Sequence, residues 1–104
     1  MRTLCSRDDL NQHPTFGATI DGEQYLVLMH EGQVKAYINR CPHLSIPLEW
    51  EEHAFVDQDT GLIRCSTHGA LFMPDSGECV SGPCYGDKLQ AVAIHESNGI
   101  IYLS

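Results

Sequence analysis

Two short segments, each pairing one cysteine with one histidine, constrain this chain more than any other feature. Residues 41–43 read Cys-Pro-His, and residues 65–68 read Cys-Ser-Thr-His. A Cys or His pair this close in sequence can hold a metal from a tight turn, and two such turns supply four ligands. We therefore predict a metal site with the rest of the chain as its scaffold. Its predicted ligands are Cys41, His43, Cys65 and His68.

Two kinds of metal centre suit two thiolates and two imidazoles. Zinc takes four such ligands tetrahedrally in a closed structural site. A 2Fe–2S cluster of mixed ligation takes two thiolates on one iron and two imidazoles on the other. Zinc fingers and knuckles usually pair like with like, whereas each segment here mixes one Cys with one His. Each turn must reach both irons of a cluster, so the mixed pairs favour the cluster, and a structural zinc domain that mediates protein interaction is the alternative.

Charge and length narrow the functional classes. The 104 residues fit a single domain, 1–104. Fourteen acidic residues outnumber six basic ones, for a formal charge of −8. Nucleic acid is therefore excluded as a partner, because phosphate binding needs a basic surface. A protein with a positive docking face is the better candidate.

The number of cysteines and the lack of long apolar runs indicate in which cellular compartment the protein is found. No run of about 18 apolar residues is present to span a membrane. The first residues meet acids at Asp8 and Asp9, which leaves no apolar stretch for a signal peptide. Five cysteines cannot form a fully paired disulfide framework, and they fit thiolate ligation in a reducing cytoplasm. We expect a cytoplasmic protein without a membrane partner.

Local patterns predict short strands and almost no helix. Ser6 and Asp9 have the spacing of a capping box, which predicts one helical turn before His13. Strands follow from Phe16 onward, joined by turns rich in Gly, Asn, Asp and Pro, so the fold class is all-β. The predicted strands cover 23–30, 33–39, 61–64, 69–73, 79–80, 88–95 and 100–103.

The ligand segments and their surroundings resemble a Rieske protein of the soluble ferredoxin type. The resemblance rests on residues 41–43, on 65–72 (Cys-Ser-Thr-His-Gly-Ala-Leu-Phe), on Gly77 and on Gly82-Pro83. It implies the Rieske fold of three stacked antiparallel sheets, in which a cluster-binding part at about 40–85 is inserted in a small basal β-sandwich. It also implies one 2Fe–2S cluster covered by the loop at Gly82-Pro83. Cys41 and Cys65 would bind the inner iron, and His43 and His68 the outer iron.

The same resemblance implies a one-electron carrier that is not catalytic alone. Its donor would be a flavin reductase, and its acceptor an oxygenase or another oxidoreductase. A non-catalytic small subunit of a larger enzyme, such as nitrite reductase, is the alternative within this class. Rieske potentials span roughly −150 to +300 mV. Ile46, Thr67, Ala70 and Phe72 stand where high-potential members carry disulfide cysteines or hydroxyls, so we expect a potential at the low end of that range.

The remaining cysteines and histidines, and the acidic residues, are not expected to bind the metal. Cys5, Cys79 and Cys84 are predicted to be small buried apolar side chains. The acidic stretch at 49–59 is interpreted as a solvated loop. The alternative hypothesis is that it forms a negatively charged patch on which a partner protein docks. The other histidines lack ligand neighbours and are predicted to be plain polar side chains: His13, His30, His53 and His95.

Overall fold

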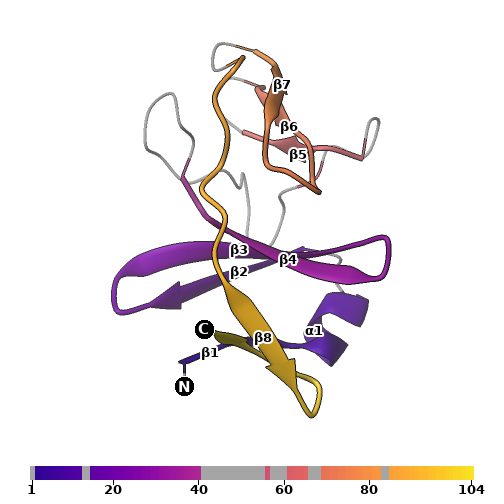
Figure 1. Cartoon of the computed structure of the whole chain (residues 1–104), viewed down its shortest axis with the longest axis vertical. Coiled ribbons are helices and arrows are strands. Elements are labelled where there is room, and N and C mark those ends of the chain that lie inside the picture. Colours follow the sequence, from indigo (N-terminus) through magenta and orange to yellow (C-terminus); the bar gives the residue numbers. More distant parts are fainter. Residues whose placement is uncertain (1, 13–14, 41–55, 57–60, 66–68, 83–84) are drawn as a thin grey trace.

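Three small antiparallel sheets are stacked along the long axis of the molecule (Figure 1). The computed structural model describes residues 2–12, 15–40, 56, 61–65, 69–82 and 85–104. Within these residues each sheet has three strands, in the orders β1-β9-β8, β2-β3-β4 and β5-β6-β7. We call them the basal, central and distal sheets. The predicted all-β class and the Rieske arrangement of three stacked sheets are confirmed.

The basal sheet joins the two ends of the chain. It contains β1 (Arg2–Ser6), β8 (Ile94–Ser97) and β9 (Ile100–Leu103), and β1 pairs with β9. The strand β1 was not predicted, because its partner lies at the opposite end of the sequence. The turn between β8 and β9 is tighter than expected: Glu96 and Ser97 belong to β8, and Asn98 takes a positive φ of 53° beside Gly99.

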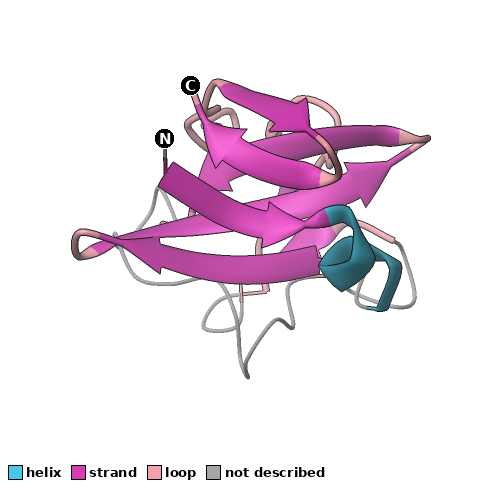
Figure 2. Ribbon diagram, turned by 90° about the horizontal axis from the view of Figure 1, so that it is seen from below, coloured by secondary structure: helices cyan, strands magenta, loops and turns pink. Residues whose placement is uncertain are grey.

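The predicted capping box is present at the start of α1 (Arg7–Gln12). The Asp9 amide donates to Ser6 Oγ at 3.1 Å, and the Ser6 amide donates to Asp9 Oδ2 at 2.9 Å. Both bonds of the motif therefore satisfy amides at the helix start. Seen from the basal side, α1 continues directly from one end of β1 (Figure 2).

The central sheet has the longest ladders. It contains β2 (Thr15–Ile20), β3 (Glu23–His30) and β4 (Gln33–Ile38). The predicted hairpin is confirmed, with a turn at Glu31 and Gly32, which both adopt positive φ; β4 ends one residue earlier than expected. Tyr25 to Leu28 of β3, the middle strand, are all buried, because apolar side chains pack against both faces of the central sheet.

The distal sheet has much shorter strands. It contains β5 (Ile63–Arg64), β6 (Leu71–Phe72) and β7 (Cys79–Ser81). A turn that includes residues 74–77 joins β6 to β7, in the gap between the strands predicted for 69–73 and 79–80, and Gly77 has a φ of 76°. The register between β6 and β7 shifts by a bulge, because Leu71 pairs with Ser81 and Phe72 with Cys79.

The strand predicted for 88–95 is wrong over most of its length, because β8 begins only at Ile94. The preceding residues pass from the distal sheet to the basal sheet and change partners on the way. Leu89 N–H donates to the Gly77 carbonyl, and Ile38 N–H donates to the Gln90 carbonyl. A segment that pairs first with one sheet and then with another cannot extend a single ladder.

Two apolar cores lie on the two faces of the central sheet. Alternate residues of β3 enter different cores, as the two-residue period of a strand requires. The basal core contains Leu4, Cys5, Leu10, Tyr25, Val27, Ala36 and Ile101. The distal core contains Leu26, Leu28, Tyr37, Ile63, Cys65, Ala70, Phe72, Cys79 and Leu89. Among the described residues, no helix is long and apolar enough to cross a membrane.

Candidate metal centre

Cys65 follows directly after β5 and is completely buried, with 0 % of its surface exposed. The Cys65 amide donates to the Ala70 carbonyl at 2.9 Å, and the Gly69 amide donates to the Cys65 carbonyl at 2.9 Å. These two bonds link Cys65 to the two residues before β6, and we call Cys65, Gly69 and Ala70 together the Cys65 turn. Gly69 adopts a φ of 67°, which glycine tolerates without strain. The second ligand segment therefore starts from a backbone fixed on both sides.

The other three predicted ligands, Cys41, His43 and His68, lie outside the described residues. Within the described part of the chain, no three His, Cys, Asp or Glu side chains gather in a way that could hold a metal. The first ligand segment follows β4 after two residues, and its start is anchored. Asn39 is buried, and its amide donates to the Gln24 carbonyl at 2.9 Å.

The surroundings of Cys65 are apolar. Cys65 belongs to the distal core together with Ile63, Ala70 and Phe72, each of which is completely buried. Neither Ala70 nor Phe72 carries a hydroxyl, so these two positions cannot donate a side-chain hydrogen bond to a sulfur. A buried thiol at a fixed turn, with apolar neighbours, fits a thiolate ligand to the shielded iron of a mixed-ligand cluster.

Cys5 and Cys79 are buried, as predicted, whereas Cys84 lies outside the described residues. Cys79 Sγ lies 3.3 Å from the Ser81 carbonyl, to which it donates. Cys5 lies in the basal core, on the other face of the central sheet. Burial, and to a smaller extent the Asp9 carboxylate, raise the pKa of the Cys5 thiol to about 11. Cys5 is therefore a protonated, unreactive thiol at neutral pH.

Gly82 supports the turn that carries Cys65, a role that the sequence did not reveal. A Cβ atom at Gly82 would lie 2.7 Å from Ala70 Cα, and Gly82 has a φ of 102°. Both the space and the backbone conformation therefore require glycine. Since Ala70 accepts the hydrogen bond from Cys65, the Gly82 backbone packs against the same turn.

Tyr37 connects the central sheet to the distal sheet and was also missed. Its hydroxyl donates to the Pro74 carbonyl at 2.9 Å inside the protein. A Cβ atom at Gly77 would lie 2.8 Å from Tyr37 Cε1, so the ring packs directly on the turn before β7. Burial, with a smaller contribution from Asp75, raises the pKa of Tyr37, which keeps the phenol protonated as a donor.

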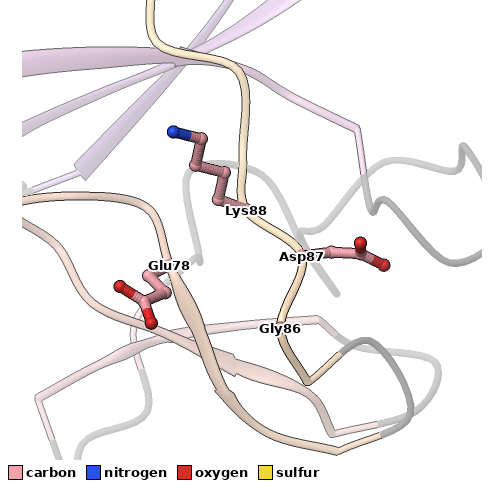
Figure 3. A pocket seen from close by; sticks show the side chains of 4 residues that line it. All are labelled: Glu78, Gly86, Asp87 and Lys88. Carbon is pink, nitrogen blue, oxygen red and sulfur yellow. The ribbon is translucent and has the colours of Figure 1, made fainter.

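A shallow hollow lies beside β7, lined by Glu78, Gly86, Asp87 and Lys88. The side chains of Glu78 and Lys88 extend to the same side of the chain, whereas Asp87 points away from both (Figure 3). Among the described residues, Glu78 and Lys88 form no ion pair, although their backbones pair in an isolated bridge. The hollow is therefore open and polar, and it lies at the surface.

Two of the histidines predicted to be ordinary can be placed. His30 ends β3 and is partly buried, whereas His95 is exposed on β8. The His95 ring stacks on Tyr102, with 5.3 Å between the ring centroids. Neither contributes to a cluster of metal-binding side chains among the described residues. His13 and His53 lie outside the described residues.

The model of the Rieske [2Fe-2S] domain family matches residues 1–95. The chain belongs to this family. Membership implies a 2Fe–2S cluster as the cofactor, and it decides against zinc as the natural metal. The resemblance read from the two ligand segments is thereby confirmed.

Individual proteins resemble the chain at identities between 20% and 26%. The oxidoreductase NdmD of Pseudomonas putida is 26% identical over 108 residues, which cover 95% of this chain and 17% of NdmD. The chain thus spans less than a fifth of that relative. The ferredoxin of carbazole 1,9a-dioxygenase from Nocardioides aromaticivorans IC177 superposes with a TM-score of 0.76 at 20% identity, covering 98% of this chain and 94% of the ferredoxin.

A structure of a complex of reduced oxygenase and oxidised ferredoxin in carbazole 1,9a-dioxygenase also contains a similar chain. The TM-score is 0.76 at 22% identity, and the match covers 98% of this chain and 90% of that chain. At these identities the two solved structures establish a shared fold.

Proposed function

We propose that this Rieske protein carries single electrons between other proteins. One observation supports this most directly: the fully buried Cys65 lies at a hydrogen-bonded turn inside a chain that matches the Rieske family over residues 1–95. A 2Fe–2S cluster supplies a one-electron redox centre when bound. The described residues provide the shielded, apolar side of such a site. We further propose that residues 1–104 act as one domain, with the cluster-binding part at about 40–85.

The proposed ligands are those of the sequence analysis. Cys41 and Cys65 hold the inner iron, and His43 and His68 hold the outer iron. The Cys65 turn and the packing of Gly82 on Ala70 keep one thiolate in place and exclude water from it. Two neutral imidazoles carry less negative charge than two thiolates, which makes reduction easier than in an all-cysteine cluster.

We propose a reduction potential at the low end of the Rieske range, which spans roughly −150 to +300 mV. The support comes from two residues of the core around Cys65. Proteins raise such potentials partly by donating hydrogen bonds to the sulfurs. Ala70 and Phe72 are completely buried, and their side chains cannot donate such bonds. A midpoint well above about 0 mV would contradict this proposal.

The proposed partners are a flavin reductase as donor and an oxygenase or another oxidoreductase as acceptor. Two comparisons support this class of partner. A similar ferredoxin chain occurs in a complex with an oxygenase, and the curated relative NdmD is itself an oxidoreductase. A small-subunit role in a larger enzyme, such as nitrite reductase, would use the same cluster with a fixed partner. In either role we propose a cytoplasmic protein that transforms no substrate alone.

Two matched variants test the site and the function together. Cys65→Ala and Cys79→Ala each remove one thiol from the same core, where both side chains are at most 1 % exposed. After anaerobic reconstitution with iron and sulfide, we expect Cys79→Ala to accept one electron per chain and pass it to an added acceptor. Cys65→Ala should do neither, because a ligand is missing. Equal cluster content in the two variants would refute the ligand assignment, and a wild-type cluster that takes up no electron would refute the carrier function.

A further inference from the structure

Exposed apolar side chains are concentrated on one short stretch of the distal part. Among the described residues, the exposed large hydrophobic side chains are Val80, at 36 %, and Tyr85, at 76 %. Both lie on a hairpin-like segment in which residues 85–88 return alongside β7: Cys79 N–H donates to the Asp87 carbonyl, and Glu78 forms an isolated bridge with Lys88. We call residues 78–82 and 85–88 the distal hairpin. Isolated exposed hydrophobics are common, but two on one projecting segment call for an explanation.

The distal hairpin is connected to the Cys65 turn by consecutive short contacts. The Tyr85 amide donates to the Gly82 carbonyl at 3.2 Å, and Gly82 packs on Ala70. Ala70 in turn accepts the hydrogen bond from the Cys65 amide. A protein bound at Tyr85 therefore contacts a segment that packs directly on one ligand turn. This end of the molecule lies farthest from the basal sheet (Figure 1).

The charge of the chain is unevenly distributed. Residues 41–89 contain eight acidic and two basic residues, a net charge of −6, whereas the remaining residues contain six acidic and four basic ones, a net charge of −2. In the basal and central sheets and the segments that adjoin them, three ion pairs neutralise acidic residues: Arg2 with Asp21, Arg7 with Glu96 and Arg40 with Glu23. Among the described residues, Glu78 and Asp87 of the distal hairpin have no such partner.

We propose that the distal hairpin is a docking surface for a redox partner with an apolar pocket inside a basic rim. Tyr85 would enter the pocket, since tyrosine is enriched among the residues that dominate binding energy at interfaces. Glu78 and Asp87 together outweigh Lys88, so the hairpin carries a net negative charge that would attract the basic rim and speed the encounter. This inference rests on the proposed carrier function, to which it adds the place and the chemistry of docking.

Cytochrome c serves as the probe, because it is a redox protein with a lysine-rich rim around its exposed haem edge. Electron transfer from the reduced protein is followed by stopped flow for the wild type, Tyr85→Ser and Tyr85→Phe. Asp87→Lys is compared with Glu31→Lys, which makes the same charge change at an exposed turn of the central sheet. Hexaammineruthenium(III), which needs no protein docking, reports the intrinsic reactivity of each variant.

We expect the second-order rate constant with cytochrome c to fall about tenfold in Tyr85→Ser and to be largely restored in Tyr85→Phe. Asp87→Lys should weaken the dependence on ionic strength more than Glu31→Lys does. Rates with hexaammineruthenium should change little in the two Tyr85 variants. Unchanged cytochrome c rates in Tyr85→Ser overturn the docking proposal. The proposal also fails if the wild type is a dimer and Tyr85→Ser dissociates that dimer without changing the rate. A wild type that reduces neither reagent instead refutes the carrier function.

Discussion

The two apolar cores on either face of the central sheet differ in how they are built. The central sheet borders both cores, and the basal core is closed on its other side by the basal sheet, in which β1 and β8 each pair with β9 at four positions. The distal core is covered by strands of two or three residues whose ladders contain two pairs each. Its other contacts come from turns, from Tyr37 and from the segment that crosses between sheets.

This difference separates a part that stabilises the fold from a part that holds a ligand site. Regular ladders satisfy backbone groups without help from particular side chains. Turns leave backbone and side chains free to present ligands, but they depend on specific contacts such as Gly82 on Ala70. Substitutions in the distal core should therefore affect both stability and the cluster, whereas substitutions in the basal core should affect stability alone.

The largest effect is expected from removing a large side chain from each core. Phe72→Ala and Ile101→Ala truncate completely buried residues of the distal and basal cores. Each should lower the free energy of unfolding by about 2–5 kcal/mol. Phe72→Ala should also lower the cluster content at temperatures where the protein stays folded. Urea titration of the apoprotein, with iron and sulfide analysis, measures both effects. Equal cluster loss in the two variants would remove the distinction between the cores.

A smaller effect is expected at two glycines with positive φ. Gly82→Ala places a Cβ atom against the Ala70 backbone, whereas Gly22→Ala in the turn between β2 and β3 meets no atom within 4 Å. In both variants the backbone strain should lower the free energy of unfolding by about 1–2 kcal/mol. In Gly82→Ala the clash should lower it by about 1–3 kcal/mol more, and the visible circular dichroism of the cluster should change. Identical unfolding curves for the two variants would show that the Gly82 contact is unimportant.

Removing one hydroxyl tests the connection between the central and distal sheets. Tyr37→Phe leaves the Pro74 carbonyl without its buried donor, which should cost about 1–3 kcal/mol in unfolding free energy. Tyr102→Phe, on a partly exposed tyrosine of the basal sheet, should change stability by less than about 0.5 kcal/mol. Thermal unfolding followed by far-ultraviolet circular dichroism compares the two. A Tyr37→Phe curve that overlays the wild type would contradict the account.

The smallest effect concerns the basal core at high pH. The folded-state pKa of Cys5, about 11, lies above the ordinary thiol value, so burial favours the protonated form. Its contribution to stability is complete below the unfolded-state pKa and is lost as the pH rises through about 11. Cys5→Ala should therefore show less loss of stability than the wild type between about pH 9 and 11. Fast alkylation of Cys5 in the native protein at pH 7 would refute its burial.

Local signals in the sequence predicted the parts of the fold that depend on neighbouring residues. The hairpin of β3 and β4 and the capping box at Ser6 and Asp9 are of this kind, and both are present. The strand β1 could not be predicted, because only its pairing with β9 makes it a strand. The segment after Lys88 was misread because its apolar residues serve two sheets in turn rather than one.

The candidate site follows the same rule. The two ligand segments, together with Gly77 and Gly82-Pro83, were enough to predict the family and its cofactor by resemblance, because each part of the motif is a short stretch of sequence. The support of the Cys65 turn by Gly82, and the bond from Tyr37 to Pro74, join residues far apart in the sequence. A hydroxyl or a glycine gives no indication of such a distant partner before the chain is folded.

Pulsed electron paramagnetic resonance of the reduced protein tests the central claim most directly. If Cys41, His43, Cys65 and His68 hold a 2Fe–2S cluster, the spectra should contain hyperfine couplings from two imidazole nitrogens, and His68→Ala should remove one or lose the cluster. A cluster without nitrogen couplings, or a protein that takes up zinc and no iron under the same conditions, would contradict the account.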